Sequence, residues 1–252
     1  MSNVLYSLGQ LYSENDKDSL AVEYLNKALV IQRKLDIANS IQATLQTLSE
    51  VYLHLENIEM AEKSAKESYD IAVILDDNMV LESTLFTLGQ VYRAKEEYDK
   101  SEDYLLQALK LNEENDGRMD YKAYTYYLMA ENFLTSGKNP EKAEAYYLQA
   151  ITLSEKAENV YYQQLAYAGL VTLNLSRNPQ KALEYLLKQN EIRETLFNDQ
   201  TRQQLNEVQI KYDTQQKELE IVRQQAEISR HESNRIILII SLSLSVVVLV
   251  LL

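Results

Sequence analysis

The eight residues LFTLGQVY, at positions 85–92, return in close variants at regular intervals along the chain. LYSLGQLY begins at Leu5 and LQTLSEVY at Leu45, so the first three copies are evenly spaced. The pattern continues as YYLMAENF from Tyr126 and as LAYAGLVT from Leu165. Self-similarity at a fixed period predicts a repeat protein, in which each unit stacks on the next one.

Each copy is followed by a second segment that has a spacing of its own. It contains a small residue, then an apolar residue four positions later, then another small residue three positions after that. In the first copy these are Ala21, Leu25 and Ala28. The later copies have Ala61, Ala65 and Ser68, then Ser101, Leu105 and Ala108, then Ala143, Tyr147 and Ala150, and finally Ala182 and Leu186. The spacing predicts a pair of helices per unit. Small residues in the first helix, which are Gly9, Ser49, Gly89, Ala130 and Gly169, would let the two helices lie close together.

The composition agrees with an all-α fold. The 252 residues include only 5 Gly and 2 Pro, against 19 Tyr. Glycine and proline mark the turns that sheets need in quantity, so their scarcity favours helices. Two connections carry Asn-Pro, at Asn139-Pro140 and Asn178-Pro179. Proline suits the first position of a helix, where its missing N–H costs nothing, so we expect helices to begin there.

These motifs resemble the tetratricopeptide repeat family, whose pattern is W-x2-L-G-x2-Y, then A-x3-F, then A. The family's positions are filled in the first copy by Leu5, Leu8, Gly9, Tyr12, Ala21, Leu25 and Ala28, with Leu in place of Trp. The resemblance covers about residues 2–190 and implies a right-handed α-solenoid of about five helix pairs. The period, from Leu45 to Leu85 for example, exceeds the family's usual length of about 34 residues, so the helices should be longer. The fifth copy departs at Thr172 and Gln189, as a capping repeat does.

Net charge and motif content exclude several functions. The formal net charge is −13, and an acidic surface repels phosphate backbones, so we expect no nucleic-acid binding. The sequence has no cysteine and no GxGxxG or HExxH motif, and its two histidines, His54 and His231, lie far apart. We therefore predict no catalytic residue, no metal ligand and no cofactor in these residues, which makes an enzyme the least favoured class.

A binding surface is the remaining expectation. In stacked helix pairs the first helices line the concave face. By register, the predicted ligand-binding residues are Tyr6, Gln10, Phe86, Gln90, Arg93, Tyr124, Tyr127 and Glu131. Aromatic side chains supply contact area at low entropic cost, which suits a protein or peptide partner. The alternative is that several of these tyrosines only pack the core.

The repeat pattern ends after about residue 198, and the segment 199–235 contains neither Gly nor Pro. Apolar or tolerated residues fall at Leu205, Val208, Tyr212, Leu219, Val222 and Ala226. This heptad spacing, with a polar interruption at Gln215, favours a helical stalk that pairs as a coiled coil in a homodimer. A single exposed helix is the alternative.

The segment 236–252 is made up entirely of Ile, Leu and Val, apart from Ser241, Ser243 and Ser245. As a helix it would extend about 25 Å, at the short end of the membrane-spanning range. We therefore expect a transmembrane helix and a single-pass membrane protein. Two interpretations stay open, either a tail anchor with the repeats in the cytoplasm, or a chain cut at both ends whose output domain follows.

The order of segments also resembles bacterial membrane histidine kinases that carry long tetratricopeptide repeats, through Leu196-Phe197-Asn198, Lys211-Tyr212 and the Lys/Glu-rich helix after them. The resemblance implies repeats that sense outside the inner membrane, although the N-terminus shows no signal peptide, so the side stays open. The expected function is a protein- or peptide-binding sensor and dimerisation region of a signal-transduction protein, of the two-component histidine kinase type. The alternatives are a tail-anchored scaffold that recruits a partner and the front of a membrane-bound helix-turn-helix transcription regulator.

Overall fold

A computed structural model describes residues 1–115 and 117–194, together with 203, 206, 209–211, 213–218, 220–222, 224 and 225. The chain divides into two compact units, Met1–Arg193 and Glu194–Leu252. The described residues of both units form helices or the turns between them. The described residues are therefore all-α, as the sequence predicts.

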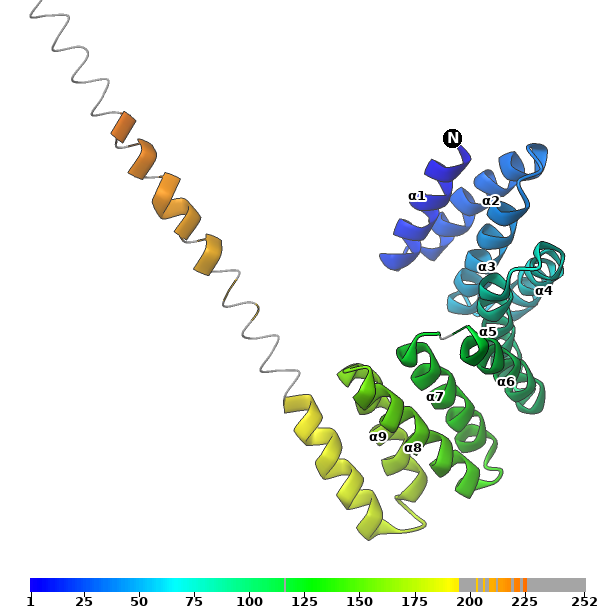
Figure 1. The fold of residues 1–252 in the computed structure, drawn as a ribbon, viewed down its shortest axis with the longest axis vertical. Coiled ribbons are helices and arrows are strands. Elements are labelled where there is room, and N and C mark those ends of the chain that lie inside the picture. Colours follow the sequence, from blue (N-terminus) through cyan, green and yellow to red (C-terminus); the bar gives the residue numbers. More distant parts are fainter. Residues whose placement is uncertain are drawn as a thin grey trace, which may run out of the picture. The chain divides into compact units, whose positions relative to one another are not determined.

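The first unit is a row of antiparallel helices (Figure 1). Their bounds are α1 Ser2–Glu14, α2 Asp18–Lys34, α3 Ala38–His54, α4 Ile58–Leu75, α5 Asn78–Ala94, α6 Tyr98–Glu114, α7 Met119–Ser136, α8 Pro140–Lys156 and α9 Val160–Asn174. Residues 179–194 are helical as well. Helices α1, α3, α5 and α7 each pack most extensively against the helix that follows, and the pairs then stack in chain order. The described residues thus form a tetratricopeptide-like solenoid of helix pairs.

The helix lengths and the connections between helices together explain the long period. Helices α2 and α3 each have 17 residues, and a short connection follows each of them. In the connection after α3, Glu56 adopts a left-handed conformation with φ of 56°. The N–H of Asn57 donates to the carbonyl of Tyr52 at 2.9 Å, and the N–H of Glu56 donates to that of Leu53 at 3.0 Å. These two bonds form a Schellman turn, which satisfies carbonyls that the helix end would leave unpaired.

A residue with positive φ recurs in the connections of the unit, and most of these residues are acidic. The two bonds of the Schellman turn also form at Asp16, Asp36, Glu96 and Glu158. The non-glycine residues with positive φ are Asp16, Asp36, Glu56, Asp76, Glu96, Asn139 and Glu158. The first five are evenly spaced along the chain, one per connection. Glycine usually occupies such a position because a Cβ is strained there. The chain therefore repeats one backbone geometry without the residue that would signal it in the sequence.

Side-chain caps begin several helices. Asn57, Asn139 and Asn159 accept hydrogen bonds from backbone N–H groups of the first turns of α4, α8 and α9. Pro140 is the first residue of α8, as the Asn-Pro motif predicts. Asn178 likewise accepts from the N–H of Lys181 at 3.2 Å, just after the second Asn-Pro. Each cap satisfies an N–H that has no partner within its helix.

Small residues set the spacing within each pair. Ala21, Ala61 and Ala143 are fully buried. A Cβ placed on Gly89 would lie 2.6 Å from Cδ2 of Leu105, and one on Gly9 would lie 2.6 Å from Cγ of Leu25. Such contacts leave no room for a larger residue. The predicted close approach of the two helices of a pair is therefore present.

In two of the pairs, a serine hydroxyl of one helix donates a hydrogen bond to a backbone carbonyl of the other helix. Ser49 Oγ on α3 donates to the carbonyl of Ala61 on α4 at 2.9 Å. In the next pair the roles are exchanged, because Ser101 Oγ on α6 donates to the carbonyl of Gly89 on α5 at 2.7 Å. A hydroxyl that bonds across two backbones works only at short helix separation.

The hydrophobic core consists of separate clusters along the array. The largest runs through α2 to α5, from Ala21 to Tyr92. Another runs through α7 to α9, from Ala130 to Leu173. Between them lies a smaller cluster of Leu105, Leu128 and Met129. Helices α6 and α7 also pack less extensively than the other stacked neighbours, so the junction between these two helices is the loosest in the row.

Polar contacts join successive pairs on the second helices. Glu62, Glu102 and Glu144 each directly follow the small residue of their helix. Each carboxylate contacts a lysine and accepts from a tyrosine hydroxyl of the next pair, the partners being Lys95 and Tyr92, Lys142 and Tyr146, and Lys181 and Tyr185. This lysine–glutamate ladder adds polar contacts between neighbouring pairs to their apolar packing.

The expectation of a transmembrane helix needs correction, and with it the single-pass membrane location. No helix in the described part of the chain is both long and apolar enough to cross a bilayer. The two 18-residue helices, α4 and α7, carry charged residues such as Glu59 and Glu131 along their length. Residues 236–252, on which the expectation rested, lie outside the described residues.

The second unit is described only in part. The described residues between 203 and 225 are helical and exposed, with Ile210, Ile221 and Val222 at 66%, 53% and 60% exposure. Most of the heptad positions predicted at 199–235 lie outside the described residues. The coiled-coil stalk and the homodimer therefore stay predictions.

Replacing Glu56 by glycine should stabilise the first unit. Its φ of 56° is strained for a residue with a Cβ, and the side chain is exposed, so the substitution removes strain without removing packing. We expect the free energy of unfolding to rise by about 0.5–1 kcal/mol in urea denaturation. Glu59→Gly is the control, because Glu59 is exposed in the first turn of α4 and glycine should there cost about 0.5–1 kcal/mol. A loss of stability in both variants would contradict the role of the left-handed turn.

Replacing Glu62 by glutamine should weaken the unit in a pH-dependent way. Hydrogen bonds from Lys66 and Lys95 lower the pKa of Glu62 from 4.5 to about 2. Because the folded-state pKa is depressed, this stabilisation is present above pH 4.5 and is lost as the pH falls towards 2. At neutral pH the variant should lose about 1 kcal/mol, since the pair is partly screened by solvent.

Urea denaturation across this pH range measures the effect, with Glu59→Gln on the same helix as the control. A stability difference between wild type and Glu62→Gln that stays constant from neutral pH to pH 2 would show that the ion pairs of the ladder do not stabilise the stacking.

Candidate functional site

The eight predicted binding residues lie on three of the first helices, α1, α5 and α7, and fall into two sets. Tyr6 and Gln10 lie on α1, where Gln10 Nε2 donates to the Tyr6 hydroxyl at 3.0 Å. That hydroxyl also lies 3.3 Å from Thr47 Oγ1 of α3. The other six lie on α5 and α7. Tyr6 and Gln10 thus tie α1 to α3 and do not border the cavity that gathers most of the other set.

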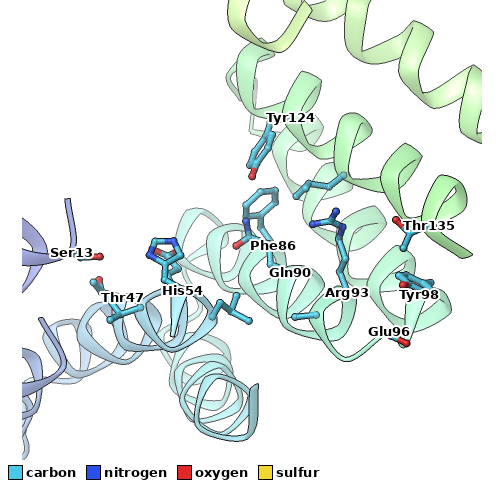
Figure 2. Close-up of a pocket in the computed structure, with 15 residues that line it drawn as sticks. Ser13, Thr47, His54, Phe86, Gln90, Arg93, Glu96, Tyr98, Tyr124 and Thr135 are labelled. Atoms are coloured by element: carbon cyan, nitrogen blue, oxygen red, sulfur yellow. The ribbon is translucent and has the colours of Figure 1, made fainter. Parts of the chain in front are cut away.

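A cavity of about 620 Å³ opens between the first helices of four successive pairs (Figure 2). We call it the central groove. Four predicted residues line it, Phe86, Gln90 and Arg93 from α5 and Tyr124 from α7. Further lining residues come from α1, α3 and the start of α6 and include Ser13, Thr47, Glu50, His54 and Tyr98. The groove is therefore built by several pairs together, as a site for an extended ligand would be.

Arg93 is the one arginine that borders the central groove, as far as the described residues show. Its Nη2 lies 3.6 Å from Oε2 of Glu131 on α7, which is a long ion pair. Glu131 Oε1 accepts a hydrogen bond from the hydroxyl of Tyr147 at 2.5 Å. Arg93 Nε is buried and has no hydrogen-bond partner within the described residues. Arg93 is thus oriented by Glu131 while keeping donors for a ligand.

Tyr127 and Glu131 are the two predicted residues of α7 that do not line the groove. Glu131 contacts Arg93, and Tyr127 packs near the rings of Tyr124 and Tyr147. The Tyr127 ring lies 6.1 Å from that of Tyr124 and 6.2 Å from that of Tyr147. Burial, and then the charge of Glu131, raise the pKa of Tyr127 to about 12. Burial also raises the pKa of Tyr147, so both hydroxyls stay protonated and can donate to acceptors such as Glu131.

Several groove residues are not among the eight predicted ones, although the repeat period relates them to these. Glu50 lies one period before Gln90 and equals it in register, and Ser13 and Leu53 correspond in the same way to Arg93. His54, Ala94 and Thr135 share the following register position and all line the groove. Stepping by one or two periods from each predicted residue, and then to its neighbour, identifies all of these.

Glu50 carries an unfavourably placed charge. Burial raises the pKa of its carboxyl above 4.5, and hydrogen bonding from Gln46 Nε2, 3.3 Å from Glu50 Oε1, opposes this rise only in part. The other carboxylate of the groove wall is Glu96, which is exposed. Two carboxylates against one guanidinium make this surface favour ligands with positive charge and backbone acceptors.

The lining of the groove is chemically mixed. Its lining combines aromatic rings, amides, hydroxyls and charges of both signs. In the described residues, no group of three or more His, Asp or Glu is placed to hold a metal ion. The polar groups are spread over four pairs instead of converging on one reacting atom, which is the arrangement of a recognition surface.

The sequence itself identifies the class of protein. Residues 2–34 match the tetratricopeptide repeat family, and residues 40–114 and 80–156 match it again in overlapping stretches. The matched residues make up more than half of the chain. The chain therefore belongs to the tetratricopeptide repeat family, as its motifs predict. No curated protein matches this sequence.

Solved structures share the fold at low sequence identity. A signal transduction ATPase with numerous domains and a tetratricopeptide repeat sensor, from Pyrococcus horikoshii, has a TM-score of 0.68 at 18% identity, over 78% of this chain and 30% of its own. The repeats of a putative kinesin light chain from Podospora anserina have a TM-score of 0.64 at 17% identity, over 78% of this chain and 96% of theirs.

A third similar structure contains a peptide. The Rap conjugation gene regulator of the plasmid pLS20, in complex with the Phr* peptide, has a TM-score of 0.59 at 18% identity, over 75% of this chain and 51% of its own. This chain thus spans about half of the Rap regulator and less than a third of the ATPase. At these identities the three structures show the fold alone.

Replacing Glu50 by glutamine should stabilise the protein at neutral pH. Because its folded-state pKa is raised, the carboxylate costs stability once the pH exceeds 4.5, and glutamine removes that cost. Urea denaturation should therefore show a gain that is absent in acid and grows as the pH rises. The exposed Glu96→Gln serves as the control. A gain of equal size at acidic and neutral pH would contradict a buried charge at this position.

Proposed function

We propose that the solenoid is the peptide-binding sensor module of a regulatory protein and that the central groove is its binding site. The observation that carries the proposal is the groove itself, where Arg93 keeps unused donors beside Phe86 and Tyr124. Likeness to a Rap regulator in complex with a peptide and to an ATPase with a repeat sensor supports the class of function.

The lining indicates how a peptide would be held. Gln90 and Arg93 follow each other along one face of α5, so their donors can meet successive backbone carbonyls of an extended chain. Phe86 and Tyr124 offer ring faces for an apolar or planar side chain. Glu50 and Glu96 favour a basic peptide over an acidic one. A short extended peptide with a positive charge is the ligand that meets all three conditions.

The wider context of the module stays a prediction. A two-component histidine kinase output and a homodimer formed through 199–235 concern residues outside the described ones or outside this sequence. The alternative function is a scaffold that recruits a partner protein through the same groove. In a sensor, binding of a peptide in the groove changes something beyond the groove, such as the pairing of two copies. In a scaffold it does not.

Peptide selection followed by a matched pair of arginine variants tests the proposal. A library of random hexapeptides is selected on the full chain, and the affinity of the enriched peptides is measured by fluorescence polarisation. Arg93→Gln should weaken binding about tenfold or more, because it removes charged donors that no other lining residue supplies. The control is Arg33→Gln, whose ion pair with Glu67 lies away from the groove.

Two results would overturn the groove as the site. Either the selection enriches no peptide that binds the chain, or the enriched peptides bind wild type, Arg93→Gln and Arg33→Gln equally well. Unchanged circular dichroism of Arg93→Gln ensures that a loss of binding is not a loss of fold.

A further inference from the structure

A second, smaller cavity of about 280 Å³ lies at the loose junction between α6 and α7. We call it the aromatic pocket. Its walls are Phe86 of α5, Tyr121 and Tyr124 of α7 and Tyr162 of α9, and Asn112 and Glu82 border it as well. Phe86 and Tyr124 also line the central groove, so the two cavities share a wall.

The four rings form a box with parallel and tilted faces. The rings of Tyr124 and Tyr162 are stacked, with centroids 5.0 Å apart and planes at 15°. Phe86 packs at 5.0 Å against Tyr121 and at 5.6 Å against Tyr124, with planes tilted by 45° and 48°. Burial raises the pKa of each tyrosine of the box, so the rings are neutral phenols whose faces can attract a cation.

Asn112 lines this pocket and has a side-chain hydrogen-bond acceptor without a donor. The residue is 2% exposed, and its Nδ2 donates to Glu82 Oε1 at 2.8 Å. Its Oδ1 is buried and finds no donor in the described part of the chain. The side chain lies close to Gly117, which also lines the pocket, since a Cβ on Gly117 would lie 2.2 Å from Asn112 Nδ2. A buried acceptor without a donor is rare and costs stability, so it points to a group that arrives from outside.

The charges of the residues that line the pocket do not cancel. Three charged residues line it, Glu82, Arg118 and Asp120. Arg118 Nε donates to Asp120 Oδ1 at 3.0 Å, so the guanidinium is paired with that carboxylate. Glu82 is bonded to a neutral amide, and its charge is not balanced by a lining residue within the described part of the chain. Asn112 Oδ1 therefore lacks a donor, and the lining carries two carboxylates against one guanidinium.

We propose that the aromatic pocket is a subsite for a cationic side chain, best fitted by the guanidinium of an arginine. A guanidinium is planar, stacks on aromatic faces and carries several donors in its plane. One N–H would reach Asn112 Oδ1 while the charge offsets that of Glu82. The inference rests on the proposed function, since the arginine belongs to the peptide that occupies the adjoining central groove.

Blocked single amino acids test the pocket separately from the groove. N-acetyl-arginine amide is titrated into the full chain, and shifts of the amide and tyrosine signals are followed by nuclear magnetic resonance. N-acetyl-citrulline amide has a similar shape and several of the same donors without the charge, and should bind about tenfold more weakly. N-acetyl-glutamate amide should not bind. Equal affinity for the arginine and citrulline probes would overturn the preference for a cation.

Two adjacent tyrosines offer a matched pair of variants. Tyr162 lines the pocket, whereas Tyr161 is 60% exposed on the same helix and does not. Tyr162→Leu should weaken the arginine probe about tenfold, and Tyr161→Leu should leave it unchanged. Asn112→Leu removes the acceptor and should also weaken the arginine probe, with circular dichroism to establish that the variant folds. Equal binding by all three variants would place the probe elsewhere and overturn the subsite.

The outcomes separate this inference from the proposed function. One outcome is that the selected hexapeptides lack basic residues, lose affinity for Arg93→Gln and bind Tyr162→Leu as tightly as wild type. This outcome would support the groove as the peptide site and contradict the cationic subsite. Binding of the arginine probe without any selected peptide would sustain the pocket while removing the peptide site. The inference is sustained in full when the selected peptides carry a basic residue and lose affinity in both Arg93→Gln and Tyr162→Leu.

Discussion

The close approach of two helices within each pair is the constraint on which the other features depend. It requires a small residue where the backbones meet, and Gly9 and Gly89 meet this requirement with side-chain atoms so near that a Cβ would collide with them. Because the helices of a pair are this close, hydroxyls such as those of Ser49 and Ser101 can bond to the backbone of the partner helix. The first helices are thereby held against the second ones, and their free faces line the central groove.

Much of the fold follows from the sequence because it depends on local, repeated features. The small residues, the leucines four positions on and the two Asn-Pro connections each act within one pair, so their spacing predicts the pairs directly. The left-handed turns were not predictable in this way. Glycine is the usual signal for them, and this chain uses acidic residues such as Glu56 and Glu96 instead. The expected transmembrane helix rested on hydrophobicity alone, in a segment outside the described residues.

The candidate site divides along the same line. Phe86, Gln90, Arg93 and Tyr124 were predictable because repeat register decides which face of a helix is concave. Glu50 obeys that register too. The aromatic pocket could not be predicted, because it depends on how α9 and the end of α6 are turned towards α7. Asn112 and Tyr162 come from different pairs, and no periodic pattern relates two residues at such unrelated positions.

The division of the core has a mechanical consequence. Two extended hydrophobic clusters, one through α2 to α5 and one through α7 to α9, are joined by a much smaller cluster at the junction of α6 and α7. An array built this way behaves as two stiff segments with one compliant joint, because its stability comes from contacts between neighbours. The central groove takes its walls from both segments. The width of the groove therefore changes when the array bends at the joint. A molecule that binds in the groove and fixes its width also fixes the bend.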